Sequence, residues 1–594
     1  MRANHVFLFG LTHASSVLSV DELVFVMDMT ALMFSRSLKA FKLIGTKSLY
    51  DCVGGNVLVR IDFLFHLIGI MTDCCDYVDK YRYLCPNQLI ITHIQVIMLR
   101  KIRITLAAIM MVLVTLLFLD VSGVLHHYLA WTARIQFLPA LLALNVVIIV
   151  ALVLLTLIFG RIYCSVICPL GIFQDIVSWI HGKRRKNRFT SSPEKRWLRY
   201  GVLALFIVAF IAGIHSLVAL LAPYSSYGRM VTNLLLPVYQ WGNNLLAAIS
   251  ERVDSYAFYS VDVWMKSLPT FLIALATFVV IVVLAWRGGR TYCNTICPVG
   301  TILAQLARFS WFKIYFDVDK CKDCSLCTKN CKASCIDFKT HKVDYTRCVT
   351  CGNCLEKCNF KALHYGHPKA APQSMEPADN EASVTDDARR AFLVGTAIVG
   401  ADIALAQAKK KVDGGLAVIE DKLPAKRSTP LTPPGSVSAR QFAQHCTACQ
   451  LCVAKCPNGV LRPSTDPLKL MQPEMSFERG ACRPECVECS TVCPTGAIKP
   501  ITVAEKSSTM IGHAVWVKAN CVVLNDGVNC GNCARHCPVG AIMMVPSDPE
   551  DESSPMVPAV NTAMCIGCGT CEYVCPARPF SAIYVEGHEV HSQI

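Results

Sequence analysis

The spacing of its cysteines limits what this 594-residue chain can fold into more than any other feature. Most of its 33 cysteines stand in runs with two or three residues between neighbours. Such spacing is typical of metal ligands, whereas a disulfide scaffold has dispersed cysteines. Six runs hold four cysteines each, and two Cys-x3-Cys pairs, Cys335 and four N-terminal cysteines make up the rest. The chain is therefore expected to fold around bound metal clusters.

Two runs lie close together, at 321–331 and 348–358, each with the spacing Cys-x2-Cys-x2-Cys-x3-Cys. Bacterial two-cluster ferredoxins have this pattern, and in them the fourth cysteine of each run ligates the other cluster. A four-cysteine zinc site is the weaker alternative, because zinc ribbons use paired Cys-x2-Cys groups. The proline that usually follows the fourth cysteine is absent from both runs, and Cys335 is left over. The expected ligands of the two [4Fe–4S] clusters are Cys321, Cys324, Cys327 and Cys358 for one, and Cys348, Cys351, Cys354 and Cys331 for the other.

Four more runs follow between residues 446 and 575, and in each the fourth cysteine precedes a proline. The same exchange of the fourth cysteine is expected between the first and second of these runs, and between the third and fourth. The exchange is less regular here, because longer spacers displace the first cysteine of the second and third runs. The expected ligands of four further clusters are Cys446, Cys449, Cys452, Cys456, Cys482, Cys486, Cys489, Cys493, Cys521, Cys530, Cys533, Cys537, Cys565, Cys568, Cys571 and Cys575.

Long apolar segments give the first half of the chain a different character. The chain is 53% hydrophobic and 17% charged, with a mean hydropathy of +0.42, which is too apolar for a wholly soluble protein. The predicted fold is a four-helix membrane unit plus one short signal or anchor helix, joined to small α+β bacterial ferredoxin-like [4Fe–4S] domains. The four membrane helices are predicted from segment length at about 104–119, 139–159, 200–222 and 269–286.

The distribution of Lys and Arg between the loops predicts which ends of these helices face the cytoplasm. The loop 160–199 holds nine Lys and Arg, whereas the loop 223–268 holds three. Lys and Arg favour the cytoplasmic side of a membrane. Loop 160–199 and the residues just after 286 are therefore predicted to be cytoplasmic, and the loops 120–138 and 223–268 are predicted to lie outside.

Changes in composition mark the expected domains. Residues 389–408 combine Arg389 and Arg390 with a short apolar run, which is typical of a twin-arginine export signal. The alternatives are a segment that anchors the chain or one that stays inside. The expected parts are an N-terminal extension of uncertain role at 1–97 with Met98 as the true start, a membrane domain at 98–300, a cytoplasmic two-cluster ferredoxin at 301–366, a linker at 367–440 and a four-cluster ferredoxin domain at 441–594.

Two segments at the cytoplasmic ends of predicted helices repeat each other. Residues 160–171 and 289–300 agree at eight of twelve positions, with the shared pattern Gly-Arg-x-Tyr-Cys-x3-Cys-Pro-x-Gly. Two cysteines from each copy would supply the four thiolates of a further cluster. Helix-stop motifs are the alternative, but the duplicated cysteines favour a redox or ligand role. The residues concerned are Cys164, Cys168, Cys293 and Cys297.

Other features exclude several functions. The formal charge of +14 could indicate nucleic-acid binding. No such partner is expected, because the basic residues crowd beside apolar segments and each cluster with its thiolates adds about −2. The sequence holds no Cys-x2-Cys-His and no Gly-x-Gly-x2-Gly, and no flavin motif, so haem c, NAD and flavin are not expected.

His215, inside the third predicted helix, is a candidate for a quinone-proximal residue; a helix–helix hydrogen bond is the alternative.

The order of these motifs resembles a known family. Paired Cys-x3-Cys-Pro motifs on a membrane unit, followed by a two-cluster ferredoxin, are similar to the NapH/MauN family and to the C-terminal part of NosR. The residues from Arg389 onward resemble the NapG/MauM ferredoxins, on the basis of Arg389-Arg390-Ala391-Phe392-Leu393 and the Cys-x8-Cys-x2-Cys-x3-Cys-Pro run at 521–538. This chain departs from them by joining both parts, and by Ala388 and Val394 in the signal-like segment.

The resemblance implies quinol-linked electron transfer toward a periplasmic acceptor. The expected protein is a membrane-bound polyferredoxin with six [4Fe–4S] clusters, and one or two more at the Cys-x3-Cys motifs. It is expected in the bacterial cytoplasmic membrane, with the C-terminal domain periplasmic, in anaerobic respiration. Its expected partners are the quinone pool, a periplasmic redox acceptor, other electron-transfer subunits and membrane lipid. An electron carrier or quinol-oxidising subunit without catalytic acid–base residues is expected; the alternative is an accessory protein that supplies reducing equivalents for maturing a metalloenzyme.

Overall fold

The computed structural model describes residues 88–120, 124–182, 189–252, 254, 258–367, 412–413, 417–418, 420–551 and 553–593. The chain divides into two units, Met1–Ile91 and Thr92–Ile594, and the helices from residue 92 onward, the ferredoxin-like modules and all their cysteine runs belong to the second. The extension before residue 88 and the segment 389–408 lie outside the described residues, so the predictions made for them stay predictions.

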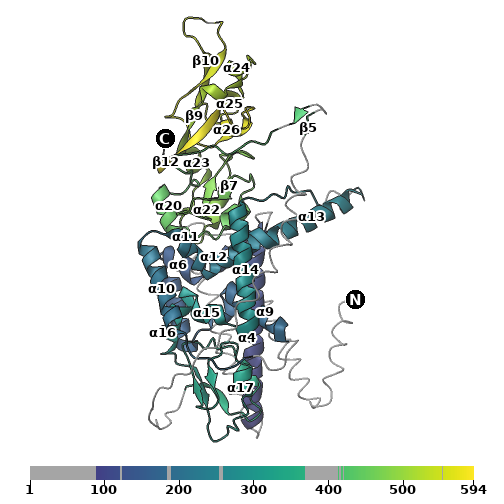
Figure 1. The fold of residues 1–594 in the computed structure, drawn as a ribbon, viewed down its shortest axis with the longest axis vertical. Helices are drawn as coiled ribbons and strands as arrows, with labels where there is room; N and C mark the ends of the chain where they lie inside the picture. The colour runs from purple at the N-terminus through teal and green to yellow at the C-terminus, as the bar shows by residue number, and fades with distance from the viewer. Residues whose placement is uncertain are drawn as a thin grey trace, which may run out of the picture. The chain divides into compact units, whose positions relative to one another are not determined.

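Helices make up the first part of the second unit (Figure 1). Two of them, α4 and α14, contain apolar stretches long enough to cross a membrane, Leu99–Leu119 and Leu268–Gly288. The helices are α4 (Gln88–Leu119), α5 (Val124–Arg134), α6 (Phe137–Leu142), α7 (Val146–Phe159), α8 (Tyr163–Val166), α9 (Pro169–Gly182), α10 (Arg196–Ile211), α11 (His215–Leu221), α12 (Pro223–Met230), the π-helix η1 (Val231–Leu235), α13 (Leu236–Glu251), α14 (Leu268–Gly288), α15 (Thr291–Thr295) and α16 (Pro298–Ala307).

The other two predicted membrane helices are each divided into two. The segment 139–159 is interrupted at Leu144, which has a left-handed φ of 52°, and Asn145 then caps α7 by accepting a hydrogen bond from the Ile148 N–H. The segment 200–222 is interrupted at Gly213, where φ is +76°. Neither segment therefore forms one unbroken helix, because a left-handed residue ends a helix whatever the hydropathy around it. The predicted unit of four membrane helices is not confirmed, since two described helices have the length and hydropathy of a membrane span.

Two ferredoxin-like modules follow the helices. The first module, residues 313–366, contains β1 (Lys313–Phe316), α17 (Leu326–Lys329), β2 (Ile336–Asp337), β3 (Lys342–Val343), α18 (Asn353–Glu356) and β4 (Leu363–Gly366). After β5 (Val412–Asp413) and β6 (Ala417–Val418), the C-terminal module, residues 420–593, contains α20 (Ala439–His445), α21 (Leu451–Lys455), β7 (Leu461–Pro463), β8 (Pro473–Met475), α22 (Glu488–Val492), α23 (Val503–Ser508), β9 (Thr509–Trp516), η2 (Lys518–Asn520), α24 (Val522–Asn525), α25 (Asn532–Arg535), β10 (Ile542–Pro546), β11 (Met556–Val560), α26 (Thr570–Val574) and β12 (Ile583–Gln593).

The strands of both modules, and β5 and β6 between them, form only small antiparallel sheets in the described residues. β1 pairs with β4, β2 with β3, β5 with β6, β7 with β8, β9 with β12 and β10 with β11. Cysteines fill much of the interior that larger sheets would enclose. In the first module, Cys327, Cys331, Cys335 and Cys354 pack with Ile314, Ile336 and Leu363 as one buried cluster.

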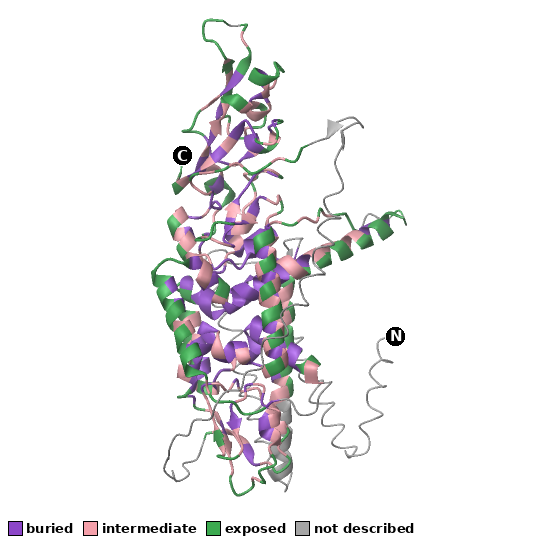
Figure 2. Ribbon diagram, in the orientation of Figure 1, coloured by how far each residue is buried: buried purple, intermediate pink, exposed green. Residues whose placement is uncertain are grey.

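The buried residues of the helical part lie along its interior, whereas the outward faces of several helices are exposed and apolar (Figure 2). On α10, Val208 is 61% and Ile211 is 80% exposed, and on α14 Val280 is 51% exposed. Large exposed apolar surfaces of this kind mark contact with lipid or with another protein.

Candidate metal centres

The 24 cysteines of the six runs lie in six sets of four. Each set combines three cysteines of one run with the fourth cysteine of its neighbouring run. The sets are Cys321, Cys324, Cys327 and Cys358; Cys348, Cys351, Cys354 and Cys331; Cys446, Cys449, Cys452 and Cys493; Cys482, Cys486, Cys489 and Cys456; Cys521, Cys530, Cys533 and Cys575; and Cys565, Cys568, Cys571 and Cys537. Three of the sets line small apolar cavities.

The local backbone explains how one run surrounds a single point. The residue after the second cysteine is left-handed in several runs, as at Ser325 with φ 61° and Gln450 with φ 64°. A one-turn helix follows at once and carries the third cysteine, Cys327 on α17 and Cys452 on α21. The chain therefore reverses within two residues and returns the third cysteine toward the first two.

The thiols have the surroundings that a cluster needs. Burial raises the pKa of Cys482 to about 11, so a free thiol there keeps its proton at neutral pH. A cluster binds thiolates and compensates this cost with its own positive charge. Backbone N–H groups add to that compensation, since Ala362 N donates to Cys358 Sγ at 3.2 Å and Ala541 N to Cys537 Sγ at 3.3 Å. The donor sets therefore fit [4Fe–4S] clusters.

A seventh set of four thiols lies within the helical part and joins the two copies of the repeat. Its members are Cys164, Cys168, Cys293 and Cys297, and each is 4% exposed. We call them the membrane quartet, because their segments follow helices that the sequence predicts to be membrane helices. Cys168 is close enough to Cys164 and Cys293 for their charges to interact, and Cys297 interacts with all three others.

Two buried arginines cross from one copy of the repeat to the other. Arg161 Nη2 donates to the carbonyl of Cys293 at 3.1 Å, and Arg290 Nη1 donates to the carbonyl of Cys164 at 2.5 Å. Both arginine side chains are fully buried. Each guanidinium also approaches a sulfur of the quartet, Cys164 Sγ at 3.8 Å from Arg161 and Cys293 Sγ at 4.0 Å from Arg290. The crossing places two positive charges beside four thiols.

The last glycine of each repeat makes room for the crossing. A Cβ atom on Gly171 would lie 2.2 Å from the Cys164 carbonyl oxygen and 2.6 Å from Arg290 Nη1. A Cβ atom on Gly300 would lie 2.4 Å from the Cys293 carbonyl oxygen and 2.9 Å from Arg161 Nη2. Because these contacts include backbone atoms that cannot move aside, both positions require glycine.

The two arginines differ in their other partners. Arg290 Nε donates to Asp175 Oδ1 at 2.8 Å, and Asp175 also lies 3.5 Å from Arg103 and 3.3 Å from Lys332. Arg161 has no carboxylate partner among the described residues and instead donates to Asn294 Oδ1 at 2.8 Å. Gln174 Nε2 lies 3.2 Å from Cys293 Sγ, which gives this thiol a hydrogen-bond donor as well.

The first module is fastened to the ends of α7, α10 and α14. Arg161 Nη1 donates to the Thr346 carbonyl at 2.9 Å, and the Arg290 N–H donates to the Lys332 carbonyl at 2.8 Å. Of these residues, Arg161 lies in the loop 160–199 and Arg290 lies in the segment 286–300. The loops that positive charge assigns to the cytoplasm are therefore the ones that hold the first module.

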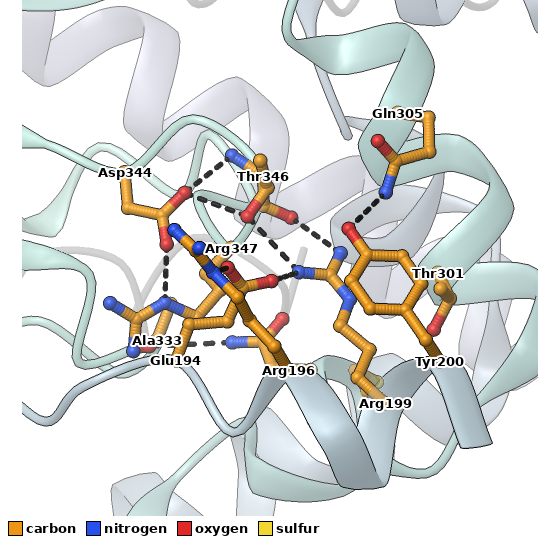
Figure 3. Close-up of polar contacts among 12 residues, drawn as sticks. Glu194, Arg196, Arg199, Tyr200, Thr301, Gln305, Ala333, Asp344, Thr346 and Arg347 are labelled. Atoms are coloured by element: carbon orange, nitrogen blue, oxygen red, sulfur yellow. Dashed lines mark hydrogen bonds and ion pairs between the residues drawn. The ribbon is translucent and has the colours of Figure 1, made fainter. Parts of the chain in front are cut away.

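A polar network completes this junction (Figure 3). Fully buried Arg199, on α10, donates to Glu194 Oε1 at 2.6 Å and to Thr346 Oγ1 at 3.0 Å. Asp344 accepts from Thr346 Oγ1 at 2.7 Å and from Arg347 Nε at 2.6 Å. Although burial opposes ionisation, these hydrogen bonds hold the pKa of Asp344 below its usual value. The network keeps the loop before Cys348 in one place against α10.

The C-terminal module contacts a different set of loops. Asp120 pairs with Lys455, and Arg134 Nη2 donates to the Thr491 carbonyl at 3.2 Å. From the loop before α14, Lys266 Nζ donates to the Val453 carbonyl at 2.6 Å. Two guanidiniums of the C-terminal module approach the ring of Trp264, Arg462 at 4.4 Å and Arg479 at 4.6 Å from the ring centre. These contacts belong to the loops 120–138 and 223–268.

Buried polar residues lead from the membrane quartet to the C-terminal module. Tyr292, one residue before Cys293, donates its hydroxyl to the Leu221 carbonyl at 3.2 Å. Arg229 interacts electrostatically with both Tyr292 and Cys449. The Arg229 guanidinium donates to the Ala219 carbonyl at 2.9 Å and to the Ala448 carbonyl at 3.5 Å. Tyr292 and Arg229 therefore lie between the quartet and the set that contains Cys449, linked to both by hydrogen bonds and electrostatic interactions.

The sequence predicts that His215 lies inside a membrane helix. In the structure it does not lie inside an unbroken helix. It is the first residue of α11, directly after the break at Gly213, and is 7% exposed. It interacts electrostatically with His445, on α20 of the C-terminal module. A role near a quinone stays a prediction.

Sequence reasoning did not single out Arg161, Arg290 or Asp175. The signal for the two arginines was present, because Arg precedes Tyr-x-x-x-x-Cys-Pro at the same position of both repeat copies. Asp175 has no counterpart in the second copy, where the equivalent residue is Ala304. Its partnership with Arg290 depends on a packing that spacing alone does not give.

Comparisons with known proteins support several iron–sulfur clusters in this chain. A family described as a 4Fe-4S binding domain matches residues 141–188 and 270–316, which hold the two repeat copies. Families described as 4Fe-4S dicluster domains match residues 344–460, 445–498 and 528–578. No solved structure matches.

Several relatives are named ferredoxin-type or electron-transport proteins. The methylamine utilization ferredoxin-type protein MauM of Methylobacillus flagellatus is 31% identical over 186 residues, which is 31% of this chain and 74% of MauM. The ferredoxin-type protein NapF of Escherichia coli is 29% identical over 164 residues, 27% of this chain and 90% of NapF. The putative electron transport protein YccM of Escherichia coli is 26% identical over 228 residues, 37% of this chain and 55% of YccM. The chain therefore belongs to the ferredoxin-type iron–sulfur protein family that includes MauM, with several [4Fe–4S] clusters and a role in electron transfer.

Proposed function

We propose that this protein is a membrane-bound polyferredoxin that passes electrons across the bacterial cytoplasmic membrane, from quinol or a cytoplasmic donor to a periplasmic acceptor. One observation carries the proposal: the two modules contact opposite ends of the same helices. Arg100, near the start of the apolar part of α4, pairs with Glu356 of the first module, and Asp120, just after α4, pairs with Lys455 of the C-terminal module. The helix between them rises about 30 Å at 1.5 Å per residue, which is the thickness of the hydrocarbon core.

Helix α14 supports the same arrangement. Lys266, just before it, contacts the C-terminal module, and Arg290, just after it, contacts the first module. Both candidate membrane spans thus have one module at each end. The exposed apolar faces of α10 and α14 would then face lipid.

Helix α13 adds a surface suited to the membrane interface. Val238, Trp241 and Leu245 are 56%, 62% and 64% exposed and recur at helical spacing. Asn244, on another face, is occupied by hydrogen bonds to Val261. An amphipathic helix with exposed Trp and aliphatic residues on one face is typical of segments that lie in the membrane surface.

The loops that each module contacts support one orientation. The first module lies on the Lys- and Arg-rich loops, which favours the cytoplasm, and the C-terminal module lies on the loops that favour the outside. The chain between residues 367 and 419 must then pass from one side to the other. The twin-arginine-like segment 389–408 is the part of that sequence suited to export of a folded, cluster-bearing domain.

The membrane quartet is the proposed relay between the modules. Six [4Fe–4S] clusters in the two modules and a further one at the quartet would divide the transfer into short steps. When bound, a cluster at the quartet supplies one-electron chemistry. Arg161 and Arg290 would balance the negative charge of its four thiolates, and Gln174 would donate a hydrogen bond to one of them.

The test is the double variant Cys164→Ser/Cys293→Ser in the full-length protein. We expect it to keep the iron of the six ferredoxin-type sets but to lose reduction of the C-terminal clusters by a quinol analogue. Full quinol-driven reduction in the double variant would mean that the quartet is structural. If even the wild type is not reduced at a catalytic rate, the alternative role, supply of reducing equivalents to a maturing metalloenzyme, replaces this proposal.

A further inference from the structure

Cys335 stands at a position that recurs after the cysteine runs of this chain. It lies four residues after Cys331, the fourth cysteine of the first run. In four of the other runs the equivalent residue is small and aliphatic. These residues are Ala362, Val460, Ala497 and Ala541. The thiol at this position is thus a departure from the chain's own pattern.

The backbone at this position already serves a cluster ligand. Ala362 and Ala541 donate their N–H groups to the fourth cysteine of their runs, and the N–H of Cys335 donates to Cys331 in the same way. What Cys335 adds is its side chain. Any effect of the thiol is therefore additional to a hydrogen bond that an alanine there would keep.

The side chain of Cys335 lies between two members of one set. Its Sγ is 3.5 Å from Cys331 Sγ, and it also forms a hydrogen bond with Cys348. Both partners belong to the set with Cys351 and Cys354. Cys335 itself is 4% exposed, so its thiol is shielded from bulk water.

We infer, building on the proposed function, that Cys335 is a positioning residue whose S–H donates a hydrogen bond to the ligand sulfurs of the cluster at Cys331, Cys348, Cys351 and Cys354, and raises that cluster's reduction potential. Reduction adds negative charge to the cluster and its sulfurs. A donor aimed at those sulfurs stabilises the reduced form more than the oxidised form.

The consequence is a direction for electrons inside the first module. The other set of this module faces solvent, since Cys324 is exposed. The set beside Cys335 faces the helical part, where Cys348 interacts with Arg161 and Cys351 with Lys332 and Arg103. A higher potential at this inner cluster draws electrons from the surface cluster toward the membrane quartet.

The test is Cys335→Ala in the purified full-length protein. Alanine is the residue that this chain uses at three of the equivalent positions, so the variant is expected to fold. We expect the iron content to be unchanged. A reductive titration followed by electron paramagnetic resonance should show one cluster with a reduction equilibrium constant about tenfold lower, which is about 59 mV for a one-electron couple. Cys335→Ser, which keeps a donor, should restore most of this shift.

Two results would overturn the inference. Loss of about four iron atoms in Cys335→Ala would make Cys335 itself a cluster ligand. Unchanged potentials with full iron would make Cys335 a space-filling residue. The titration needs neither quinol nor a membrane, so it is independent of whether electrons cross the bilayer.

Discussion

Arg290 provides a direct test of what holds the two repeat copies together. Its guanidinium is fully buried and donates to Asp175 and to the Cys164 carbonyl. Arg290→Ala removes both hydrogen bonds and leaves Asp175, whose side chain is 13% exposed, with Arg103 at 3.5 Å and Lys332 at 3.3 Å as its remaining partners among the described residues. Breaking a buried ion pair typically costs about 3–5 kcal/mol. Because two cations remain, we expect the lower value, about 3 kcal/mol in the free energy of unfolding of the helical part.

The assay is thermal unfolding in detergent, followed by tryptophan fluorescence, together with iron content. Arg196→Ala is the matched control, since Arg196 makes an exposed ion pair with Glu194 at 3.2 Å and its side chain is 80% exposed. Such a pair contributes at most about 1 kcal/mol. Arg290→Ala should unfold at a clearly lower temperature than the control and lose iron from the quartet. Equal unfolding temperatures and equal iron would show that the crossing arginine does not hold the repeats together.

Three further predictions concern the clusters, the C-terminal module and the topology. The anaerobically purified protein should contain at least about 24 iron atoms per chain, and zinc without visible iron–sulfur absorbance would refute the cluster assignment. Burial lowers the pKa of His591 to about 4, so between pH 6.5 and 4 the unfolded chain binds a proton that the folded chain excludes. Stability of the C-terminal module should fall by about 2 kcal/mol from pH 7 to pH 5, and His591→Gln should flatten this dependence; an equally steep profile in the variant would contradict it. In spheroplasts, external protease should cleave residues 441–594 in the wild type but not in Arg389→Lys/Arg390→Lys, and protection in both would place this module in the cytoplasm.

The composition of the cysteine sets could be read from the sequence because ligand spacing is local. A run such as 446–456 needs only one reversal and one helical turn to surround a point, so its spacing already contains the geometry. The interruptions at Leu144 and Gly213 could not be read in this way. Hydropathy over 139–159 and 200–222 reports only that the side chains are apolar, and it is insensitive to a single left-handed residue.

The residues around the membrane quartet were harder to predict for a different reason. Arg161 and Arg290 stand next to the cysteines of their own repeat copy, yet each donates to the backbone of the other copy. Asp175 reaches Arg290 across 115 residues of sequence. Such contacts depend on how α9 packs against α14, and the repeat pattern does not specify that packing. For a similar reason, spacing alone assigned no role to Cys335, because its partner Cys348 lies in the neighbouring run.

The central claim, that electrons pass between the two modules through the membrane quartet, is tested most directly in sealed vesicles with the first module facing outward. A membrane-impermeant reductant such as dithionite is added outside, and reduction of the enclosed C-terminal clusters is followed by their visible absorbance. The wild type should show reduction of both modules, whereas Cys164→Ser/Cys293→Ser should show reduction of the first module only. Enclosed clusters that stay oxidised in the wild type, or that are reduced equally fast in the double variant, would contradict the account.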